Sequence, residues 1–174
     1  KKKKNTNLSN ITWVRGKYDQ QELEELYTNS DDRMAFIEKE LKDKIRNPLE
    51  MKALGFCVGV RHAEYMAKQF NTMGVRSISL SGNSERRYRD SAISKLRKGE
   101  INAIFTVDLF NEGVDIPEVD TILFLRPTES SILFTQQLGR GLRLSDNKEC
   151  LTVLDFIGHS NKKFSYSKKF NTLV

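Results

Sequence analysis

The sequence predicts an α/β fold with a mostly parallel sheet, and three observations lead to this prediction. From Lys52 onward, apolar runs of strand length alternate with stretches of helix length. The runs are continuous, which is typical of parallel strands that are buried on both faces. A chain of 174 residues with 38% hydrophobic residues can bury such a sheet in one core.

The first fifty residues have a different composition and pattern, and they predict a mainly helical segment that we call the preface. They are nearly neutral, with 11 Lys/Arg against 10 Asp/Glu, and Pro48 closes them. We therefore expect two parts, a preface over 1–50 and an α/β domain over 51–174. The expected preface elements are a short strand or extended segment over 11–16, a helix after Asp19 and a helix after Asp31 or Asp32.

The α/β part divides into strands and helices of ordinary length. Because the carboxyl ends of parallel strands share one edge of a sheet, we expect functional residues in the loops that follow the strands. In chain order we expect strands over 53–59, 75–80, 101–107, 121–126 and 150–158, and helices over 62–74, 84–99 and 130–143.

Composition restricts the possible partners and cofactors. The net charge of +6 and the basic segment 84–98, with six bases against two acids, suggest an affinity for polyanions. Cys57 and Cys150 lie in apolar runs without a CxxC pair, so we expect buried structural thiols and no metal site. The chain has no signal peptide and no membrane-spanning run, which predicts a cytoplasmic setting without a membrane partner.

The loop after the third sheet strand, 106–120, is long and acidic. Long loops at this end of a parallel sheet usually carry function. Gly113 allows close backbone approach, and Asp115 lies two residues after it. For Glu118 and Asp120 we expect only a solvated acidic connection.

The stretch FTQQLGRGLR (134–143) holds the most unusual helix. Gln136, Arg140 and Arg143 lie at i, i+4 and i+7 and therefore share one face. An amide and two guanidiniums suit phosphate binding, and Gly139 and Gly141 leave the surroundings of Arg140 open. By spacing alone, a salt-bridged surface helix is an equally good interpretation.

Shorter signals follow the first two sheet strands. Arg61, Ser81 and Gly82 offer side-chain or backbone donors to phosphates, whereas His62 fits a helix start better than a base or a ligand. The chain contains no GxxxxGK[ST] loop, so a nucleotide that meets these arginines must be held mainly by another part of a protein.

Three motifs in order give the chain a family resemblance. ALGFCVGVRHAEYMA looks like helicase motif IV, FTVDLFNEGVDIP looks like motif V, and QQLGRGLR fits the motif VI pattern QxxGRxxR. Over residues 52–158 the sequence resembles the second RecA-like lobe of a superfamily-two (DEAD/DEAH-type) helicase. The residues of these motifs look closest to those of the bacterial restriction-type (ResIII-like) helicase branch, although Gln136 stands where many relatives have His.

The resemblance implies a RecA-like three-layer fold and a role for each matching residue. Arg140 and Arg143 would be arginine fingers that reach ATP and Mg²⁺ bound mainly to a first lobe of the same polypeptide, so this lobe alone would be inactive. Gln136, Gly113 and Asp115 would line the nucleotide side. Thr106, Ser81, Gly82 and Arg61 would contact a nucleic-acid backbone, with DNA favoured over RNA. Residues 1–50 would be the interlobe linker of a longer protein.

Two hypotheses of different class follow. The leading one is the second motor lobe of an ATP-dependent helicase or translocase. The alternative is a non-catalytic nucleic-acid or protein binding module that kept the RecA-like fold, and it predicts that the natural chain has no P-loop upstream.

Overall fold

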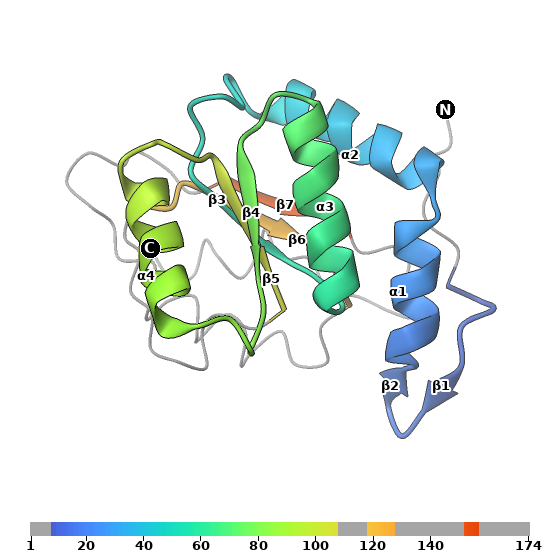
Figure 1. Ribbon diagram of the computed structural model, residues 1–174. Coiled ribbons are helices and arrows are strands. Elements are labelled where there is room, and N and C mark those ends of the chain that lie inside the picture. Colours follow the sequence, from blue (N-terminus) through green and yellow to red (C-terminus); the bar gives the residue numbers. More distant parts are fainter. Residues whose placement is uncertain (1–7, 108–117, 128–151, 157–174) are drawn as a thin grey trace, which may run out of the picture.

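The computed structural model describes residues 8–107, 118–127 and 152–156. Within these residues, five strands form one parallel sheet in the order β4-β5-β3-β6-β7, which confirms the predicted fold class (Figure 1). The expected helix over 130–143 lies outside the described residues. The strands are β3 (Ala53–Phe56), β4 (Ser77–Leu80), β5 (Ala103–Thr106), β6 (Thr121–Phe124) and β7 (Thr152–Asp155).

Helices cover both faces of the sheet, so the fold has three layers. In Figure 1 the strands lie between α4 on one side and α3 on the other. Consecutive strand residues enter separate core clusters: Ala53 packs with α2 and α3, whereas Leu54 packs with α4. The helices are α2 (Asp31–Lys44), α3 (Val60–Thr72) and α4 (Arg86–Arg97).

The preface has more structure than two helices. A small antiparallel hairpin of β1 (Trp13–Val14) and β2 (Lys17–Tyr18) precedes α1 (Gln20–Thr28). Asp19 caps α1 as predicted, because its carboxylate accepts a hydrogen bond from the Glu22 N–H at 2.9 Å.

The cap predicted for the next helix, α2, was wrong by one or two residues. Ser30 is the cap, and its hydroxyl accepts from the Arg33 N–H at 3.2 Å. Asp31 and Asp32 lie instead in the first turn, where their charge favours the positive end of the helix dipole.

The predicted boundaries differ from the observed ones where a strand passes into a helix. β3 ends at Phe56 rather than at Gly59, because residues 57–59 already turn into α3. α3 runs from Val60 to Thr72, two residues earlier at each end than the predicted helix over 62–74. Gly74 lies just past its end with a φ of +83°, which favours glycine. Cys57 is a buried thiol as predicted, while Cys150 lies outside the described residues.

Candidate functional site

The strand ends meet at one edge of the sheet, as the sequence predicts. In register, Phe56 of β3 lies between Thr106 of β5 and Phe124 of β6. The residues that follow the strands therefore form one continuous border, which we call the carboxyl edge. It consists of residues 57–59, 81–82, 107, 125–127 and 156.

The turn after β4 is well defined and accessible. Ser81 is half-buried and Gly82 is exposed. The Ser81 N–H donates to the Ser84 hydroxyl at 2.9 Å, and the Arg89 guanidinium donates to the Gly82 carbonyl at 2.6 Å. Arg89 from the basic segment thus fixes this turn, whereas Arg87, two residues earlier in α4, is exposed.

Thr106 at the end of β5 is enclosed by the sheet. It is 2% exposed, and its carbonyl accepts a hydrogen bond from the Cys57 N–H at 2.8 Å. A direct contact of Thr106 with nucleic acid stays a prediction, and it requires the side chain to become accessible first.

The first turn of α3 carries Arg61 and an unexpected carboxylate. Arg61 is exposed, as a backbone contact requires. Gly59 caps α3 without a side chain, and the Glu24 carboxylate from α1 accepts the His62 N–H at 2.9 Å. A methyl group on Gly59 would overlap that carboxylate. Glu24 is thus an anion bound at the positive end of α3.

Sequence reasoning missed Glu24 because its partner is 38 residues away. One sequence signal could have indicated that such a partner exists. A helix that begins after a glycine leaves its first N–H groups without a local side-chain acceptor.

A buried polar cluster of Tyr27, Arg33 and His62 joins the preface to the carboxyl edge. The Arg33 guanidinium donates to the carbonyls of Phe156 at 2.9 Å and Leu125 at 3.2 Å. It also lies over the Tyr27 ring, with 3.8 Å from its central carbon to the ring centroid. Arg33 therefore connects the preface to the ends of both β6 and β7.

His62 completes this cluster as a neutral side chain. Its Nδ1 accepts the Val58 N–H at 3.1 Å, and its ring lies 5.3 Å from the Tyr27 ring. Burial, reinforced by the Arg33 charge, lowers the pKa of His62 to about 3. This agrees with the prediction that His62 is a helix-start residue and does not act as a base.

The cluster fills the point where the connections between strands diverge. In the order of the sheet, β4 lies to one side of β3, whereas β7 lies on the opposite side of β6. Ligands of open α/β sheets commonly bind in the crevice at this point. Here the Arg33 guanidinium donates to the Leu125 carbonyl, just after β6. Tyr27 packs with Val58, just after β3.

The acidic residues before β6 are not merely solvated. The Asp120 carboxylate accepts from the Lys52 N–H at 3.0 Å and from the Thr121 hydroxyl at 2.8 Å. Glu118 pairs with Arg97 of α4 at 3.2 Å. The expectation of a solvated connection was therefore wrong for Asp120, whose carboxylate joins the amino ends of β3 and β6. The pair of Glu118 with Arg97, the last residue of α4, is exposed to solvent, as expected for a solvated connection.

The remaining predicted site residues lie outside the described residues. Two such segments, 108–117 and 128–151, follow directly on described parts of the carboxyl edge, Val107 and Pro127. The structure thus places the starting points of both segments but gives no geometry for the predicted residues. Those residues are Gly113, Asp115, Gln136, Arg140 and Arg143.

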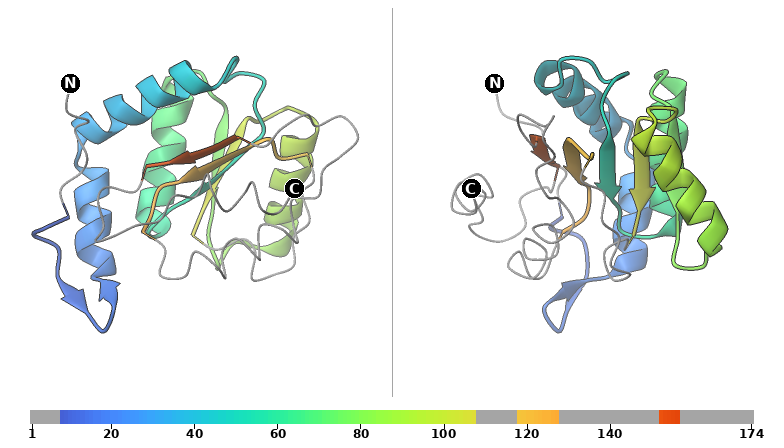
Figure 2. Two further views of the ribbon diagram at one scale, coloured as in Figure 1. Left: turned by 180° about the vertical axis from the view of Figure 1, so that it is seen from behind. Right: turned by 90° about the vertical axis from the view of Figure 1, so that its left-hand side faces the viewer.

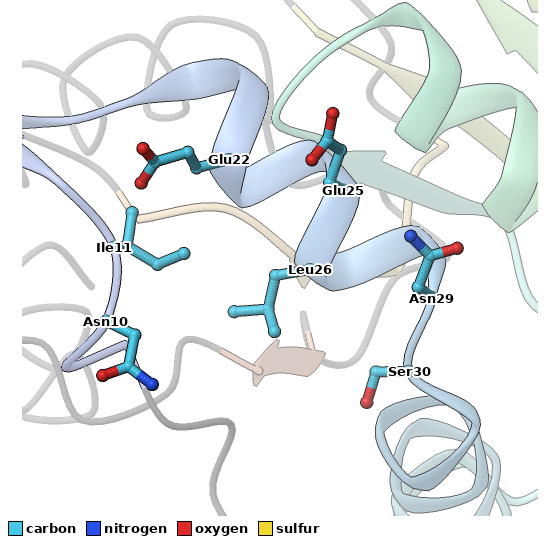
Figure 3. A pocket seen from close by; sticks show the side chains of 7 residues that line it. All are labelled: Asn10, Ile11, Glu22, Glu25, Leu26, Asn29 and Ser30. Atoms are coloured by element: carbon cyan, nitrogen blue, oxygen red, sulfur yellow. The ribbon is translucent and has the colours of Figure 1, made fainter.

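An open pocket of about 510 Å³ lies within the preface, between residues 10–11 and the segment 22–30, rather than on the carboxyl edge (Figure 3). Glu22 and Glu25 contribute carboxylates to its wall, and Glu22 already accepts from the backbone N–H and hydroxyl of Thr12 at 2.7 and 2.8 Å. Carboxylates repel phosphate, so this pocket does not suit a nucleotide.

Across the described part of the chain, no helix is both long and apolar enough to cross a bilayer.

Comparison with known protein families shows which family this α/β domain belongs to. Residues 32–145 match the family described as Helicase conserved C-terminal domain, and this range includes segment 108–117 and residues 128–145 of the second segment that leaves the edge. The chain belongs to this helicase family. The three stretches that resemble motifs IV, V and VI lie within the matched range.

Individual relatives agree with this membership. The Saccharomyces cerevisiae protein named "Putative ATP-dependent helicase IRC3" is 36% identical over 106 residues, which are 61% of this chain and 15% of IRC3. The splicing RNA helicase prp28 of Neosartorya fischeri is 25% identical over 109 residues, 63% of this chain and 13% of prp28. The chain therefore spans a small part of the length of these relatives.

Solved structures show the same fold at low identity. The yeast DEAD-box splicing factor Prp28 aligns with a TM-score of 0.62 at 13% identity, covering 83% of this chain and 31% of Prp28. The C-terminal part of the Fun30 ATPase domain aligns with a TM-score of 0.58 at 18% identity, covering 84% of this chain and 46% of that chain. The chain thus has the RecA-like fold of helicase C-terminal lobes.

Proposed function

We propose that this chain is the second motor lobe of an ATP-dependent nucleic-acid helicase or translocase. The observation that carries the proposal is the family match through residue 145, which includes the QQLGRGLR motif. The position of Pro127 at the carboxyl edge supports it, because the segment with this motif starts there. The parent protein would be the enzyme, and this lobe alone would be inactive.

The proposed catalytic contribution is positive charge. Arg140 and Arg143 would act as arginine fingers on ATP and Mg²⁺ that a first lobe holds, and Gln136, Gly113 and Asp115 would lie on the nucleotide side. Charge develops on the phosphoryl oxygens in the transition state, so a guanidinium there lowers the barrier. Since fingers and nucleotide would sit on different lobes, hydrolysis would require the lobes to close.

The proposed partner is nucleic acid, and we favour DNA over RNA. The exposed Arg61 and the Ser81–Gly82 turn are accessible groups at the carboxyl edge that can meet phosphates. DNA rests on the resemblance to the restriction-type branch, and a cytoplasmic setting rests on composition. RNA is the competing outcome, since prp28 is named an RNA helicase.

Arg140→Ala in the full-length parent protein tests the finger role. We expect the ATPase kcat to fall by about 10³-fold or more, because the finger acts on the transition state, while ATP affinity changes only a few-fold. Single-turnover hydrolysis and a nucleotide-binding titration measure the two quantities. Arg46→Ala is the matched control, since Arg46 is an exposed arginine at the opposite, amino end of the strands.

Loss of ATP affinity with normal residual turnover would contradict the finger role of Arg140. ATP hydrolysis by the purified 174-residue chain itself, abolished by the same substitution, would contradict the dependence on a first lobe. A parent protein without any upstream P-loop would favour the non-catalytic binding module instead.

A further inference from the structure

A hairpin in the preface lies outside the matched family domain. We call residues 12–19 the aromatic hairpin. β1 and β2 pair Trp13 with Tyr18, and the turn between them is Arg15–Gly16. Both turn residues have positive φ, +52° and +81°, as a tight two-residue hairpin turn requires. The family match begins only at residue 32, so family membership assigns no role to this hairpin.

The aromatic hairpin is firmly attached to α1. The Glu22 carboxylate accepts from the Thr12 N–H at 2.7 Å and from its hydroxyl at 2.8 Å. The Asp19 N–H donates to the Thr12 carbonyl at 2.8 Å, which closes the base of the hairpin. Tyr18 packs against the buried cluster that contains Leu23. The hairpin therefore extends from the amino end of α1 and is held there by hydrogen bonds and packing.

Its outer surface combines one large ring with positive charge. Trp13 is 58% exposed, and its ring meets the Tyr18 ring edge-to-face at 4.5 Å between centroids. Arg15 and Lys17 are exposed on the same hairpin. The carboxylates of Asp19 and Glu22 accept hydrogen bonds from backbone N–H groups.

The aromatic hairpin projects at the carboxyl end of the lobe. Glu24 in the middle of α1 binds the first turn of α3, so the amino end of α1 and the hairpin before it extend past that turn. Figures 1 and 2 show the hairpin beyond the lower end of α3, at the end of the molecule where the strands terminate. It thus lies on the same side as Arg61.

We propose that the aromatic hairpin binds single-stranded nucleic acid, with a base stacked on Trp13 and adjacent phosphates at Arg15 and Lys17. The inference rests on the proposed nucleic-acid binding of this lobe and names a further site for it. Stacking of a base on an exposed aromatic ring, next to cations that track the backbone, is the usual chemistry of single-strand binding. The exposed cations Arg15 and Lys17 beside the ring of Trp13 favour a polyanion as the partner.

Trp13 is the chain's single tryptophan, so its fluorescence reports on this site alone. The 174-residue chain is titrated with short oligothymidylate, while a fluorescein-labelled copy measures affinity by anisotropy in parallel. We expect binding by anisotropy together with quenching of the Trp13 emission, both weakened by salt. Oligouridylate in the same assay compares RNA with DNA.

Variants separate stacking from support of the hairpin. Trp13→Leu should weaken binding about tenfold because it removes the ring, whereas Trp13→Phe should restore most of the affinity. Arg15→Glu should weaken binding and reduce the salt slope. Leu49→Ala and Arg46→Glu are matched controls, since both residues are exposed at the amino end of the strands. Circular dichroism checks that each variant is folded.

The outcomes distinguish this inference from the proposed function. Binding by anisotropy without Trp13 quenching, and with Trp13→Leu at wild-type affinity, overturns the hairpin site and leaves the proposed function standing. Absence of any binding overturns the hairpin site and also counts against nucleic-acid contact by this lobe. Quenching by addition of the purified first lobe, but not by oligonucleotide, shows a protein interface and overturns it as well.

Discussion

The buried polar cluster of Tyr27, Arg33 and His62 shows how single side chains hold the preface in place. Arg33 is 5% exposed and His62 is fully buried, yet each has a specific partner at the carboxyl edge or next to it. The partners of Arg33 are 92 and 123 residues away in sequence. No local pattern could predict these contacts, because spacing along a helix indicates which residues share a face and not what that face meets.

The low pKa of His62 makes stability depend on pH. In the unfolded chain His62 gains a proton near pH 6.5, whereas in the folded chain it does so only near pH 3. The unfolded state therefore binds more protons between these values, so the free energy of unfolding falls as pH falls through this window. We expect a loss of about 2 kcal/mol by roughly pH 5, measured by urea unfolding.

His62→Asn should flatten this pH dependence between about pH 5 and 7. The amide oxygen of asparagine can still accept the Val58 N–H, so the variant keeps that hydrogen bond. His159→Asn removes the other histidine and serves as the comparison. If His159→Asn flattens the profile and His62→Asn leaves it steep, the burial of a neutral His62 is wrong.

Among the elements, the centre of the sheet depends on one close approach. Gly55 of β3 lies in register with Phe105 of β5, and the Phe105 ring rests over the glycine. Phe105 in turn meets Phe70 of α3 edge-to-face, with 4.8 Å between ring centroids. The absence of a side chain at Gly55 thus lets α3 pack onto the sheet.

Gly55→Ala should destabilise the fold by about 1–3 kcal/mol, because the new methyl group would overlap the Phe105 ring. Phe105→Leu in the same chain should recover part of the loss, which a double-mutant cycle by chemical denaturation would measure. Gly82→Ala is the control for stability, since a methyl group there meets nothing within 4 Å. Additive effects of the Gly55 and Phe105 substitutions would show that the two sites do not interact.

The elements were predicted well where they are buried and poorly where they are short. The sheet strands read as continuous apolar runs, and Asp19 and Gly74 marked helix ends correctly. The return strand Lys17–Tyr18 was missed, because two residues carry no periodicity and Arg15–Gly16 is not a common turn pair. The position of the carboxyl edge could be predicted from the order of strands and helices alone. The roles of Glu24 and Arg33 could not, because their contacts form only in the folded chain.

On the scale of the molecule, the preface is part of the core. Met34, Ile37 and Leu41 of α2 are buried in the same cluster as Ala53 and Phe105 of the sheet. Burial of each such large side chain contributes about 1.5–3 kcal/mol. Three of them together approach the whole stability of an ordinary domain, about 5–15 kcal/mol.

A chain that begins at residue 51 should therefore be largely unfolded or lack a cooperative thermal transition. Differential scanning calorimetry and near-ultraviolet circular dichroism measure this directly. A chain that lacks only residues 1–7 is the control, because none of the contacts described above involves them. A cooperative transition of the shorter chain at the full-length temperature would show that the sheet does not need α2.

Arg33 and Glu24 have a thermodynamic consequence beyond holding the preface in place. A ligand that needs the crevice at the ends of β3 and β6, or the positive end of α3, must displace these two side chains. Linkage is reciprocal, so docking of the preface weakens such a ligand by the same factor by which the ligand loosens the preface. Ligand affinity at this edge and amide-exchange protection in α1 should thus vary inversely across any series of preface variants.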